Sequence, residues 1–425
     1  MTAAAPTPMT MAEKALARAA GRSQVAAGEF VTASVDLAMT HDIFAADVFG
    51  MLADAGIRRV WDADRVVVVF DHLVPPPTIE AAEAQRRARQ HAADFGIRHF
   101  YAERAGICHQ VLVEKGHVLP GRLVVATDSH TTTHGALGAA GSGIGSTEMA
   151  YVLATGRLWF KVPETIRFEL VGELPEWVTA KDIVLFIAGR FGADVARYRA
   201  IEMGGPAASR LSVAGRLTIS NMAVELGAKF GFFEADEAAL AFLTGRTREP
   251  LEPFGPDDGA RYLAAYSIDV SDLEPQVALP HNVDNVRPLS TVRGLRVDQA
   301  FLGSCTNGRL EDLAAAAAIL RARTVHPDVR MVVAPASQEV YRQAARQGLL
   351  EIFSQAGAVV LNPGCGPCFG GHQGLLAPGE RCIGSHNRNF CGRMGSSAAE
   401  ICLASPAVVA ASAVAGAIAD PREYA

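Results

Sequence analysis

The run Val66-Val-Val-Val-Phe70, followed directly by Asp71-His72, decides how this chain folds. Four valines and a phenylalanine leave no polar face, which is typical of a strand buried on both sides in a parallel sheet. The apolar run stops where an acid and an imidazole begin. Ligands of open α/β sheets bind beyond the carboxyl ends of the strands. The stretch therefore predicts an α/β fold with reactive groups at one edge of a sheet.

Four more apolar runs end in polar residues in the same way. They are Leu123–Ala126 before Thr127-Asp128-Ser129-His130, Ala300–Gly303 before Ser304-Cys305-Thr306-Asn307, Ala358–Leu361 before Asn362–Cys368, and Arg381–Gly384 before Ser385–Phe390. A further strand, Met331–Ala334, and three segments of helical composition are predicted between them: Ile79–Phe95, Leu310–Arg323 and Gln338–Gln347. Alternating strands and helices indicate α/β layers. Five reactive strand ends in one chain predict a shared cleft.

Two interruptions divide the chain into three candidate domains. One lies near Val162-Pro163, and the other is the proline-rich segment Leu273–Leu289, which we interpret as a linker. The expected domains are residues 1–163, 164–288 and 289–425, each of ordinary domain size.

The composition fits a globular protein with large cores. The chain has 425 residues, of which 49% are hydrophobic, and its formal net charge of -6 argues against nucleic-acid binding as its main function. The apolar stretch Leu403–Ala419 is broken by Pro406, so we predict a buried helix there and no membrane span. Met1–Met11 lacks the basic region of a secretory signal. We expect a cytoplasmic protein.

The seven cysteines form a poor disulfide framework, since their number is odd and their spacing uneven. Cys365 and Cys368 make a Cys-x-x-Cys pair, and Cys305 is a third thiol at a strand end. The pair alone fits zinc, an iron–sulfur cluster or a dithiol, and a closed metal site needs four ligands. Three thiolates would leave one metal position open, as a Lewis acid requires. The remaining thiols are interpreted as small buried hydrophobes: Cys108, Cys382, Cys391 and Cys402.

Groups for proton transfer and for anion binding accompany the thiols. Asp71-His72 pairs a carboxylate with an imidazole, and Asp128-Ser129-His130, with His109 nearby, offers the same residue types. A Ser/His/Asp hydrolase is the alternative, but the chain has no Gly-x-Ser-x-Gly elbow. Arg388 and Arg393 could clamp a carboxylate with paired hydrogen bonds.

Two short motifs have other interpretations. Cys365-Gly-Pro-Cys368 matches the thioredoxin tetrapeptide, but Asn-Pro-Gly precedes it where thioredoxins usually carry a tryptophan. The run Gly138–Gly145 lacks the full dinucleotide fingerprint, so a tight turn into the following helix is expected there.

Taken together, these residues resemble those of the aconitase superfamily, most closely the large subunits of 3-isopropylmalate dehydratase and homoaconitase in their shorter, archaeal-type form. The matching blocks, in order along nearly the whole chain, are Val35–Asp42, Phe70–His72, Gly106–Gln110, Ala126–His130, Ser220–Ala228, Gly303–Asp312, Asn362–Cys368 and Asn387–Arg393.

The resemblance implies three α/β/α domains of the aconitase iron–sulfur type around a central cleft, with the swivel domain absent. It implies one [4Fe–4S] cluster per subunit, held by Cys305, Cys365 and Cys368. The residues that would manage the leaving hydroxyl, with His72 as proton donor, are Asp71, His72, His109, Asp128, His130 and Glu225. The residues that would contact substrate are His41, Ser129, Asn387, Arg388 and Arg393.

The resemblance also implies a partner. The family's serine base sits in a swivelling domain for which this sequence shows no counterpart, so a separate small subunit is expected to carry it. The implied reaction is dehydration and rehydration of a hydroxy di- or tricarboxylate, with 3-isopropylmalate in leucine biosynthesis as the leading substrate. Homoaconitate, 2,3-dimethylmalate and maleate or citraconate remain alternatives. A non-catalytic iron–sulfur sensor is the alternative of a different class.

Three departures from the family pattern lie near the expected site. Ile43-Phe44 follows His41-Asp42 where relatives usually carry a small or hydroxylated pair, His386 replaces a hydroxylated neighbour, and Cys391 is atypical in its block. They bear on the choice of substrate and leave the chemistry unchanged.

Overall fold

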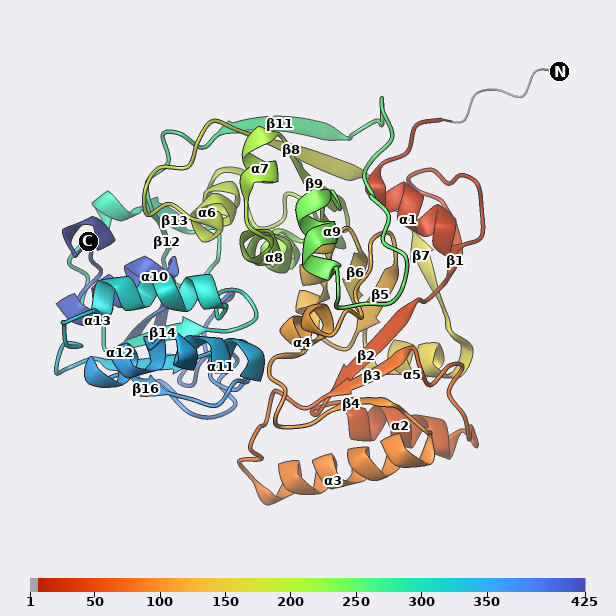
Figure 1. The fold of residues 1–425 in the computed structure, drawn as a ribbon, viewed down its shortest axis with the longest axis horizontal. Helices are drawn as coiled ribbons and strands as arrows, with labels where there is room; N and C mark the ends of the chain where they lie inside the picture. Colours follow the sequence, from red (N-terminus) through yellow and green to blue (C-terminus); the bar gives the residue numbers. More distant parts are fainter. Residues whose placement is uncertain (1–6, 425) are drawn as a thin grey trace.

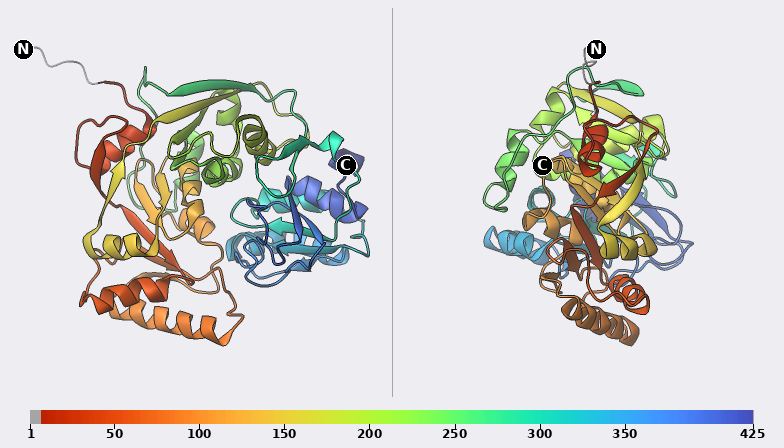
Figure 2. Two further views of the ribbon diagram at one scale, coloured as in Figure 1. Left: turned by 180° about the vertical axis from the view of Figure 1, so that it is seen from behind. Right: turned by 90° about the vertical axis from the view of Figure 1, so that its right-hand side faces the viewer.

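The computed structural model describes residues 7–424 and shows a mixed α/β fold with three large, mainly parallel sheets. The regions built on these sheets lie around a common centre (Figure 1). The first region, red to yellow, lies opposite the third, cyan to blue, and the second, green, lies across the top; Figure 2 shows the arrangement from behind and from the side. The predicted α/β class is confirmed.

The first sheet contains the valine run. Its five parallel strands are, in order across the sheet, β4 (His99–Tyr101), β3 (Val66–Val69), β2 (Leu37–His41), β5 (Leu123–Ala126) and β6 (Ala140–Gly143). Its helices are α2 (Ala45–Asp54), α3 (Ile79–Asp94), α4 (Cys108–Glu114) and α5 (Ser146–Thr155). Val66 and Val68 pack in one hydrophobic cluster with α2 and α5, whereas Val67 and Val69 pack in another with α4. Alternate side chains point to opposite faces, so this strand is buried on both.

The second sheet is also all parallel. Its order is β10 (Phe230–Phe233), β9 (Ala200–Gly204), β8 (Thr165–Val171) and β11 (Ala264–Asp269). Its helices are α6 (Ala180–Phe191), α7 (Pro206–Arg210), α8 (Val213–Met222), the short 3-10 helix η2 (Ala223–Leu226) and α9 (Glu237–Leu243). It meets the first region at the 3-10 helix η1 (Ser129–Leu137), where a Cβ on Gly135 would lie 1.8 Å from the Gly231 carbonyl oxygen. Only glycine allows the two regions to approach so closely there.

The third sheet has seven strands. Its order is β13 (Val286–Pro288), β12 (Gln276–Ala278), β18 (Glu400–Leu403), β17 (Arg381–Gly384), β14 (Gln299–Gly303), β15 (Arg330–Ala334) and β16 (Val359–Val360). Its helices are α10 (Leu310–Leu320), α11 (Gln338–Arg346), α12 (Leu349–Gln355) and α13 (Pro406–Ala415), with 3-10 turns η3 (Leu289–Thr291) and η4 (Pro421–Glu423). The expected linker Leu273–Leu289 therefore contains two strands, which pair antiparallel and extend this sheet. Three-residue strands are too short to show a period in sequence.

Two further local predictions need correction. Gly138–Gly145 is more than a turn, because it contains β6, and Gly145 then caps α5. In Leu403–Ala419, β18 ends at Leu403 and the buried helix occupies Pro406–Ala415, with proline in its first turn, where no amide hydrogen is needed. No helix within residues 7–424 is both long and apolar enough to cross a membrane.

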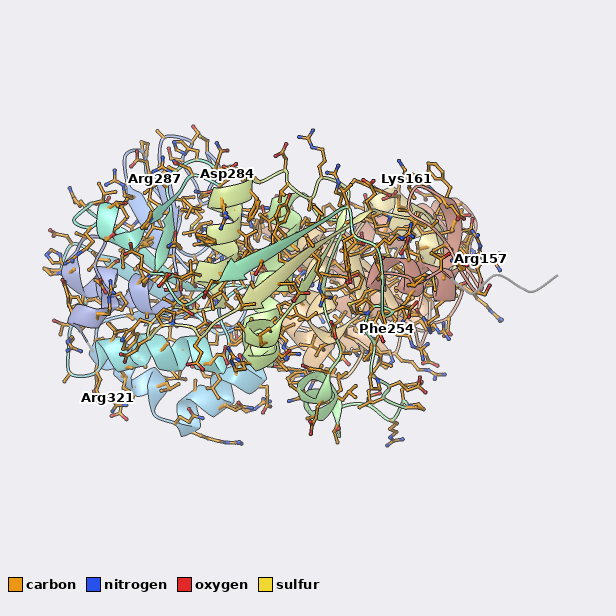
Figure 3. All side chains as sticks on the ribbon, turned by 90° about the horizontal axis from the view of Figure 1, so that it is seen from above. Arg157, Lys161, Phe254, Asp284, Arg287 and Arg321 are labelled. Atoms are coloured by element: carbon orange, nitrogen blue, oxygen red, sulfur yellow. The ribbon has the colours of Figure 1, made fainter. Side chains whose placement is uncertain are left out.

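A two-stranded antiparallel ribbon closes the far side of the first region. It consists of β1 (Phe30–Ser34) and β7 (Arg157–Lys161) and packs near α1 (Met11–Ala19). Seen from above, Arg157 and Lys161 lie at the end of the molecule opposite Arg287 and Arg321 (Figure 3). The ribbon is thus remote from the third sheet.

The first and third regions are joined by backbone hydrogen bonds. The amide of Ile107 donates to Ala336 and the amide of Gln338 donates to Ala105, both at 2.9 Å. The amide of Cys365 donates to the carbonyl of Asp71 at 2.7 Å. The loop that carries the Cys-x-x-Cys pair is therefore fastened to the end of β3.

Candidate active site

A cavity of about 370 Å³ lies between the first and third regions. All five strand ends singled out in the sequence contribute to its lining, because β3, β5, β14, β16 and β17 direct their carboxyl ends toward the same centre. The predicted site residues in the lining are His41, Asp71, His72, His109, Asp128, Ser129, His130, Cys305, Cys365, Cys368, Asn387, Arg388 and Arg393. Glu225 lies behind this surface and bonds two of its members.

His72 is held as a charged imidazolium. Its Nδ1 lies 2.7 Å from Asp71 Oδ1 and its Nε2 lies 3.6 Å from Asp128 Oδ2. Burial opposes protonation, but the Asp71 charge and the hydrogen bonds to Asp128 and Asp71 outweigh it and raise the pKa of His72 well above its ordinary value. A proton at Nε2 therefore faces the cavity at neutral pH.

Asp71 also receives a backbone bond. The Cys108 amide, first in α4, donates to Asp71 Oδ2 at 2.7 Å, so the carboxylate caps a helix that has no side-chain cap of its own. Burial raises and the His72 charge lowers the pKa of Asp71, and the net result is a lowered pKa. The acid's orienting carboxylate stays ionised.

His41 stacks on His72, but its ring is neutral where that of His72 is charged. Their ring centroids are 3.9 Å apart at an interplanar angle of 18°. Burial and the nearby His72 charge lower the pKa of His41 to about 4. Both ring nitrogens of His41 are buried, and neither has a hydrogen-bond partner within residues 7–424. A neutral imidazole in the cavity wall with unused nitrogens is suited to accept or donate one bond to a ligand.

Asp128 connects three histidines. Its Oδ1 lies 2.7 Å from His109 Nε2 and accepts from the His130 amide at 2.7 Å. Burial raises its pKa, but the bonds from His109, His130 and His72 dominate and hold the pKa of Asp128 well below its ordinary value. One carboxylate thus fixes the rings around the cavity.

The chain of contacts continues into the third region through Glu225. Its Oε1 lies 2.8 Å from His130 Nε2 and accepts from Arg388 Nε at 2.7 Å. Burial would raise the pKa of Glu225, but His130 and Arg388 lower it. Burial opposes protonation of His130, and its bonds to Asp128 and Glu225 overcome this and raise its pKa. Glu225 therefore links the imidazoles to the candidate carboxylate-binding arginine.

The three thiols lie on the opposite wall, and two of them, Cys305 and Cys368, receive amide or guanidinium donors. Asn221 Nδ2 donates to Cys305 Sγ at 3.1 Å, and Asn387 Nδ2 approaches the same sulfur at 3.5 Å. Arg393 donates to Cys368 Sγ at 3.5 Å. A hydrogen bond from Cys365 lowers the pKa of Cys368 well below its ordinary value, whereas burial raises the pKa of Cys305 to about 12. Donors aimed at sulfur suit thiolate ligands.

This donor set fits a cluster better than a single ion. One tetrahedral zinc would hold its sulfurs about 3.8 Å apart, given Zn–S bonds of about 2.3 Å. Within residues 7–424, the three cysteines form no set of ligand atoms within 4.8 Å of one another. Cys365 and Cys368 are hydrogen-bonded to each other, so Cys305 is the ligand that lies apart, and three soft donors that do not gather round one point suit a polynuclear iron–sulfur group.

The one set that meets the 4.8 Å criterion in the described chain is His41, Asp42, Asp71 and His72. Its geometry is explained without a metal. Asp42 Oδ1 accepts from the amides of Asp71 and His72, and Oδ2 accepts from the Leu73 amide at 2.7 Å. Asp42 thus holds the turn that presents the acid.

Two functional neighbours were missed in the sequence. Asn221 lies four residues before Glu225, within a matching block from which we took only the carboxylate. Cys108 is the small buried hydrophobe that we predicted, and it also lines the cavity with the three predicted thiols, which we did not predict. Its position at the start of α4, in the block Gly106–Gln110, was the available signal.

The departures from the family pattern fall in different places. Ile43 and Phe44 line the cavity, together with Ile107 and Phe369. Burial and the Lys181 charge lower the pKa of His386 well below its ordinary value, and its ring, outside the lining, contacts Phe301 at 5.5 Å between centroids. Cys391 is exposed, which corrects its interpretation as a buried hydrophobe.

Comparison with known proteins gives consistent matches. The profile of the aconitase family (aconitate hydratase) matches residues 13–294 and 290–416. The probable 3-isopropylmalate dehydratase large subunit of Methanothermobacter thermautotrophicus is 55% identical, over 97% of this chain and 99% of that protein. The 3-isopropylmalate dehydratase large subunit 1 of Methanopyrus kandleri is 53% identical, over 98% and 99%. The probable methanogen homoaconitase large subunit of M. thermautotrophicus is 51% identical, over 98% of each chain. With this coverage and the cavity described above, the chain belongs to the aconitase family.

Proposed function

We propose that this chain is the large catalytic subunit of a 3-isopropylmalate dehydratase, an iron–sulfur hydro-lyase that isomerises a hydroxy diacid by loss and re-addition of water. The observation that carries the proposal is the union, in one cavity, of a buried imidazolium, three thiols and two guanidinium groups. The names of the full-length relatives support the substrate and the partnership with a small subunit.

Cys305, Cys365 and Cys368 would hold the cluster, as one [4Fe–4S] group per subunit. When bound, such a group supplies a Lewis acid that polarises the bond between carbon and the departing hydroxyl. The amides of Asn221 and Asn387 and the guanidinium of Arg393 lie against the sulfurs and would stabilise their negative charge.

His72 would act as the general acid. Its Nε2 proton passes to the departing hydroxyl oxygen, which leaves as water, and the reverse transfer accompanies rehydration. Asp71 holds Nδ1–H and keeps the ring oriented. Asp128 and His109 hold the surrounding rings, and Asp128 Oδ2, 3.6 Å from His72 Nε2, favours the charged form of the ring. The imidazolium thus returns to one position in each cycle.

The substrate's carboxylates would be bound by Arg388, Arg393, Asn387, Ser129 and His41. Arg393 Nε is buried and has no protein partner among the described residues, so it is free to bind an anion. Glu225 orients Arg388 through its Nε and leaves the other nitrogens for the ligand. A serine of the small subunit would remove the proton from the adjacent carbon.

The apolar part of the wall favours an alkyl-substituted diacid. Ile43, Phe44, Ile107 and Phe369 line the same cavity as the charged groups. An isopropyl group would be desolvated against them, whereas the third carboxylate of a homoaconitate would have to give up water there without a cation. Homoaconitase is therefore the second candidate; the smaller alkyl acids 2,3-dimethylmalate and citraconate, and the unsubstituted maleate, would fill this wall less completely.

This substrate assignment gives a direct prediction for Phe44. Phe44→Ala should raise KM for 3-isopropylmalate about tenfold, since losing an aromatic contact in a hydrophobic pocket costs roughly 1–3 kcal/mol, and should leave a tricarboxylate substrate almost unaffected. Steady-state kinetics on both substrates measures the ratio. Phe30→Ala on the remote ribbon is the matched control, since Phe30 is equally aromatic and well exposed. An unchanged ratio would remove Phe44 from substrate selection.

A non-catalytic iron–sulfur sensor is the candidate of a different class. Burying an imidazolium between two carboxylates costs desolvation energy. A sensor would have no need of such a group, whereas an enzyme uses it for proton transfer. The complete proton-transfer set therefore favours the enzyme. The seven cysteines, all within residues 7–424, form no disulfide, which suits a cytoplasmic location, and we propose that location on this ground alone.

The test is anaerobic reconstitution with iron and sulfide, followed by addition of the small subunit and an ultraviolet assay for the unsaturated intermediate. We expect brown colour and turnover of 3-isopropylmalate in excess of turnover of homologous tricarboxylates. Colour with no turnover of any hydroxy acid would favour the sensor, and a colourless protein would contradict both.

A further inference from the structure

Lys181 is the second residue of α6, and its side chain is fully buried. Its Nζ donates to the carbonyl of Ser385 at 2.8 Å and also to the carbonyl of His386. These acceptors are more than two hundred residues away in sequence and belong to the third region, just after β17. A lysine of the second region thus reaches into the loop that carries Asn387 and Arg388.

The lysine has no carboxylate partner within ion-pair distance in the part of the chain that the structure describes. Its sequence neighbour Asp182 is occupied elsewhere, since its Oδ2 accepts from the amide and hydroxyl of Thr179 and its Oδ1 accepts from the Gln276 amide. A fully buried lysine without an ion pair is costly. The two backbone carbonyls are what it binds instead.

The same loop is tied on its other side. Ser385 Oγ accepts from the amide of Gly303 at 3.0 Å and lies 3.2 Å from the carbonyl of Asn307. Residues 303–307 carry Cys305. The two ties fix the loop after β17 relative to the loop after β14, and Asn387 then reaches both Cys305 Sγ and Thr306 Oγ1, the latter at 2.9 Å.

We propose that Lys181 is a positioning residue: by holding the Ser385 and His386 carbonyls it aims Asn387 at the Cys305 sulfur and Arg388 at the substrate. This rests on the proposed function, since it assigns a role around the same site. Both hydrogen bonds persist when Lys181 loses its proton, because a neutral amine still has two hydrogens to donate. Burial lowers the pKa of Lys181 to about 7, so the amine changes its charge near neutral pH. The two hydrogen bonds to the loop persist in both charge states.

The test compares Lys181→Met, which keeps the length and loses the donors, with Lys181→Arg, which keeps them. The reconstituted Met variant should retain iron and sulfide but show about a tenfold higher KM for the hydroxy acid with a smaller change in kcat, because ground-state binding through Arg388 is lost. Its cluster should also have a more negative midpoint potential, measured by an electron paramagnetic resonance titration, since an amide bond to a ligand sulfur is weakened. The Arg variant should restore both values most of the way.

The matched control is Lys229→Met. Lys229 is also largely buried but lies over the rings of Phe160 and Tyr198, away from the loop after β17. It should keep the wild-type KM and potential. If Lys181→Met fails to fold, Lys181→Gln replaces it, since its shorter amide loses only part of the tie.

A wild-type KM and potential in the folded Lys181→Met or Lys181→Gln protein would overturn the inference. An equal KM increase in Lys181→Met and Lys181→Arg would also overturn it, since the donors would then not be responsible. Failure of the proposed function looks different, because the wild-type complex itself would then be colourless or inactive.

Discussion

The two walls of the cavity differ in how completely the protein satisfies their polar groups. The acid–base wall consists of Asp71, His72, His109, Asp128 and His130, and each of these side chains has a close protein partner. The sulfur wall consists of Cys305, Cys365, Cys368 and Arg393. Among the described residues, Cys305 and Cys368 receive amide or guanidinium donors at 3.1 to 3.5 Å, no nitrogen donor reaches Cys365, and Arg393 Nε has no partner.

The difference indicates which wall has its final geometry before a ligand binds. Paired carboxylates and imidazoles fix their own orientation and charge, so the acid–base wall is preorganised by the polypeptide. The sulfur wall collects soft donors whose remaining valence only a bound group can use. Substitutions in the first wall should therefore change rate with the site intact, whereas substitutions in the second should remove the site itself.

The largest expected effect is in the sulfur wall. Cys305→Ser should abolish cluster binding and lower turnover by at least about 10³-fold, because charge stabilisation by a metal site contributes several kcal/mol to the barrier. Visible absorbance and iron content measure the first effect, and the dehydration assay measures the second. The control is Cys391→Ser, an exposed thiol that should change neither. Retained colour in Cys305→Ser would show that another ligand completes the site.

A substitution in the acid–base wall should lower activity without loss of the cluster. His72→Ala should keep the iron content and colour and lose about 10²- to 10⁴-fold in kcat, the usual contribution of a general acid. Because a positively charged His72 is the active form, wild-type activity should fall as pH rises through the raised pKa of His72, on the alkaline side of its ordinary value. The pH profile of kcat checks the sign. An acid-side loss alone, or bleaching of the variant, would mean that His72 has another role.

Glu225 sharpens the comparison because it joins His130, in the acid–base wall, to Arg388, which lies in the third region with the thiols. Glu225→Gln preserves shape but removes the charge that holds His130 and Arg388. We expect kcat/KM to fall about 10- to 100-fold, corresponding to a charge-assisted hydrogen bond of roughly 1.5–3 kcal/mol. Cluster content should stay at the wild-type level, since no thiol contacts this carboxylate. Loss of iron in this variant would place Glu225 in the support of the sulfur wall.

How far the sequence predicts this site depends on the range of the contacts. Within each sheet the strand ends could be predicted to converge, Asp71 with Asp128 and Cys305 with Cys365, because a parallel sheet puts the carboxyl ends of its strands at one edge; this rule does not predict that the two sheets then face each other. Strand and helix limits were also close to the observed ones: Leu123–Ala126 and Arg381–Gly384 match β5 and β17.

Contacts between regions could not be predicted from local pattern. Nothing near Asn221 shows that its amide will meet Cys305, and nothing near Lys181 shows that it will end against the carbonyls after β17. The strands β12 and β13 were missed because each has only three residues; they pair with one another, and a single residue pair, Ala278 with Leu403, joins β12 to the distant β18. Cys108 is buried as predicted, but its place beside the cavity depends on the Asp71 carboxylate, which follows β3 and accepts from the Cys108 amide.

The smallest expected effect concerns imidazoles that stay neutral in the folded protein, of which His117 is a half-buried example. Burial, with the nearby charge of His99, lowers the pKa of His117 to about 4 from an ordinary value of 6.5. As pH falls below 6.5 the unfolded chain takes up a proton that the folded one refuses until about pH 4, so stability is lost across that window.

His117→Gln, which can still bond the Tyr101 hydroxyl, should remove about 1–3 kcal/mol of this loss. The Tm of the variant, followed from pH 8 to pH 4.5, should therefore decline less steeply than that of the wild type. His41, His134 and His386 are fully buried and also have lowered pKa values, so part of the acid sensitivity should persist. Parallel Tm profiles would mean that His117 is protonated in the folded protein and paired in a way that this structure does not contain.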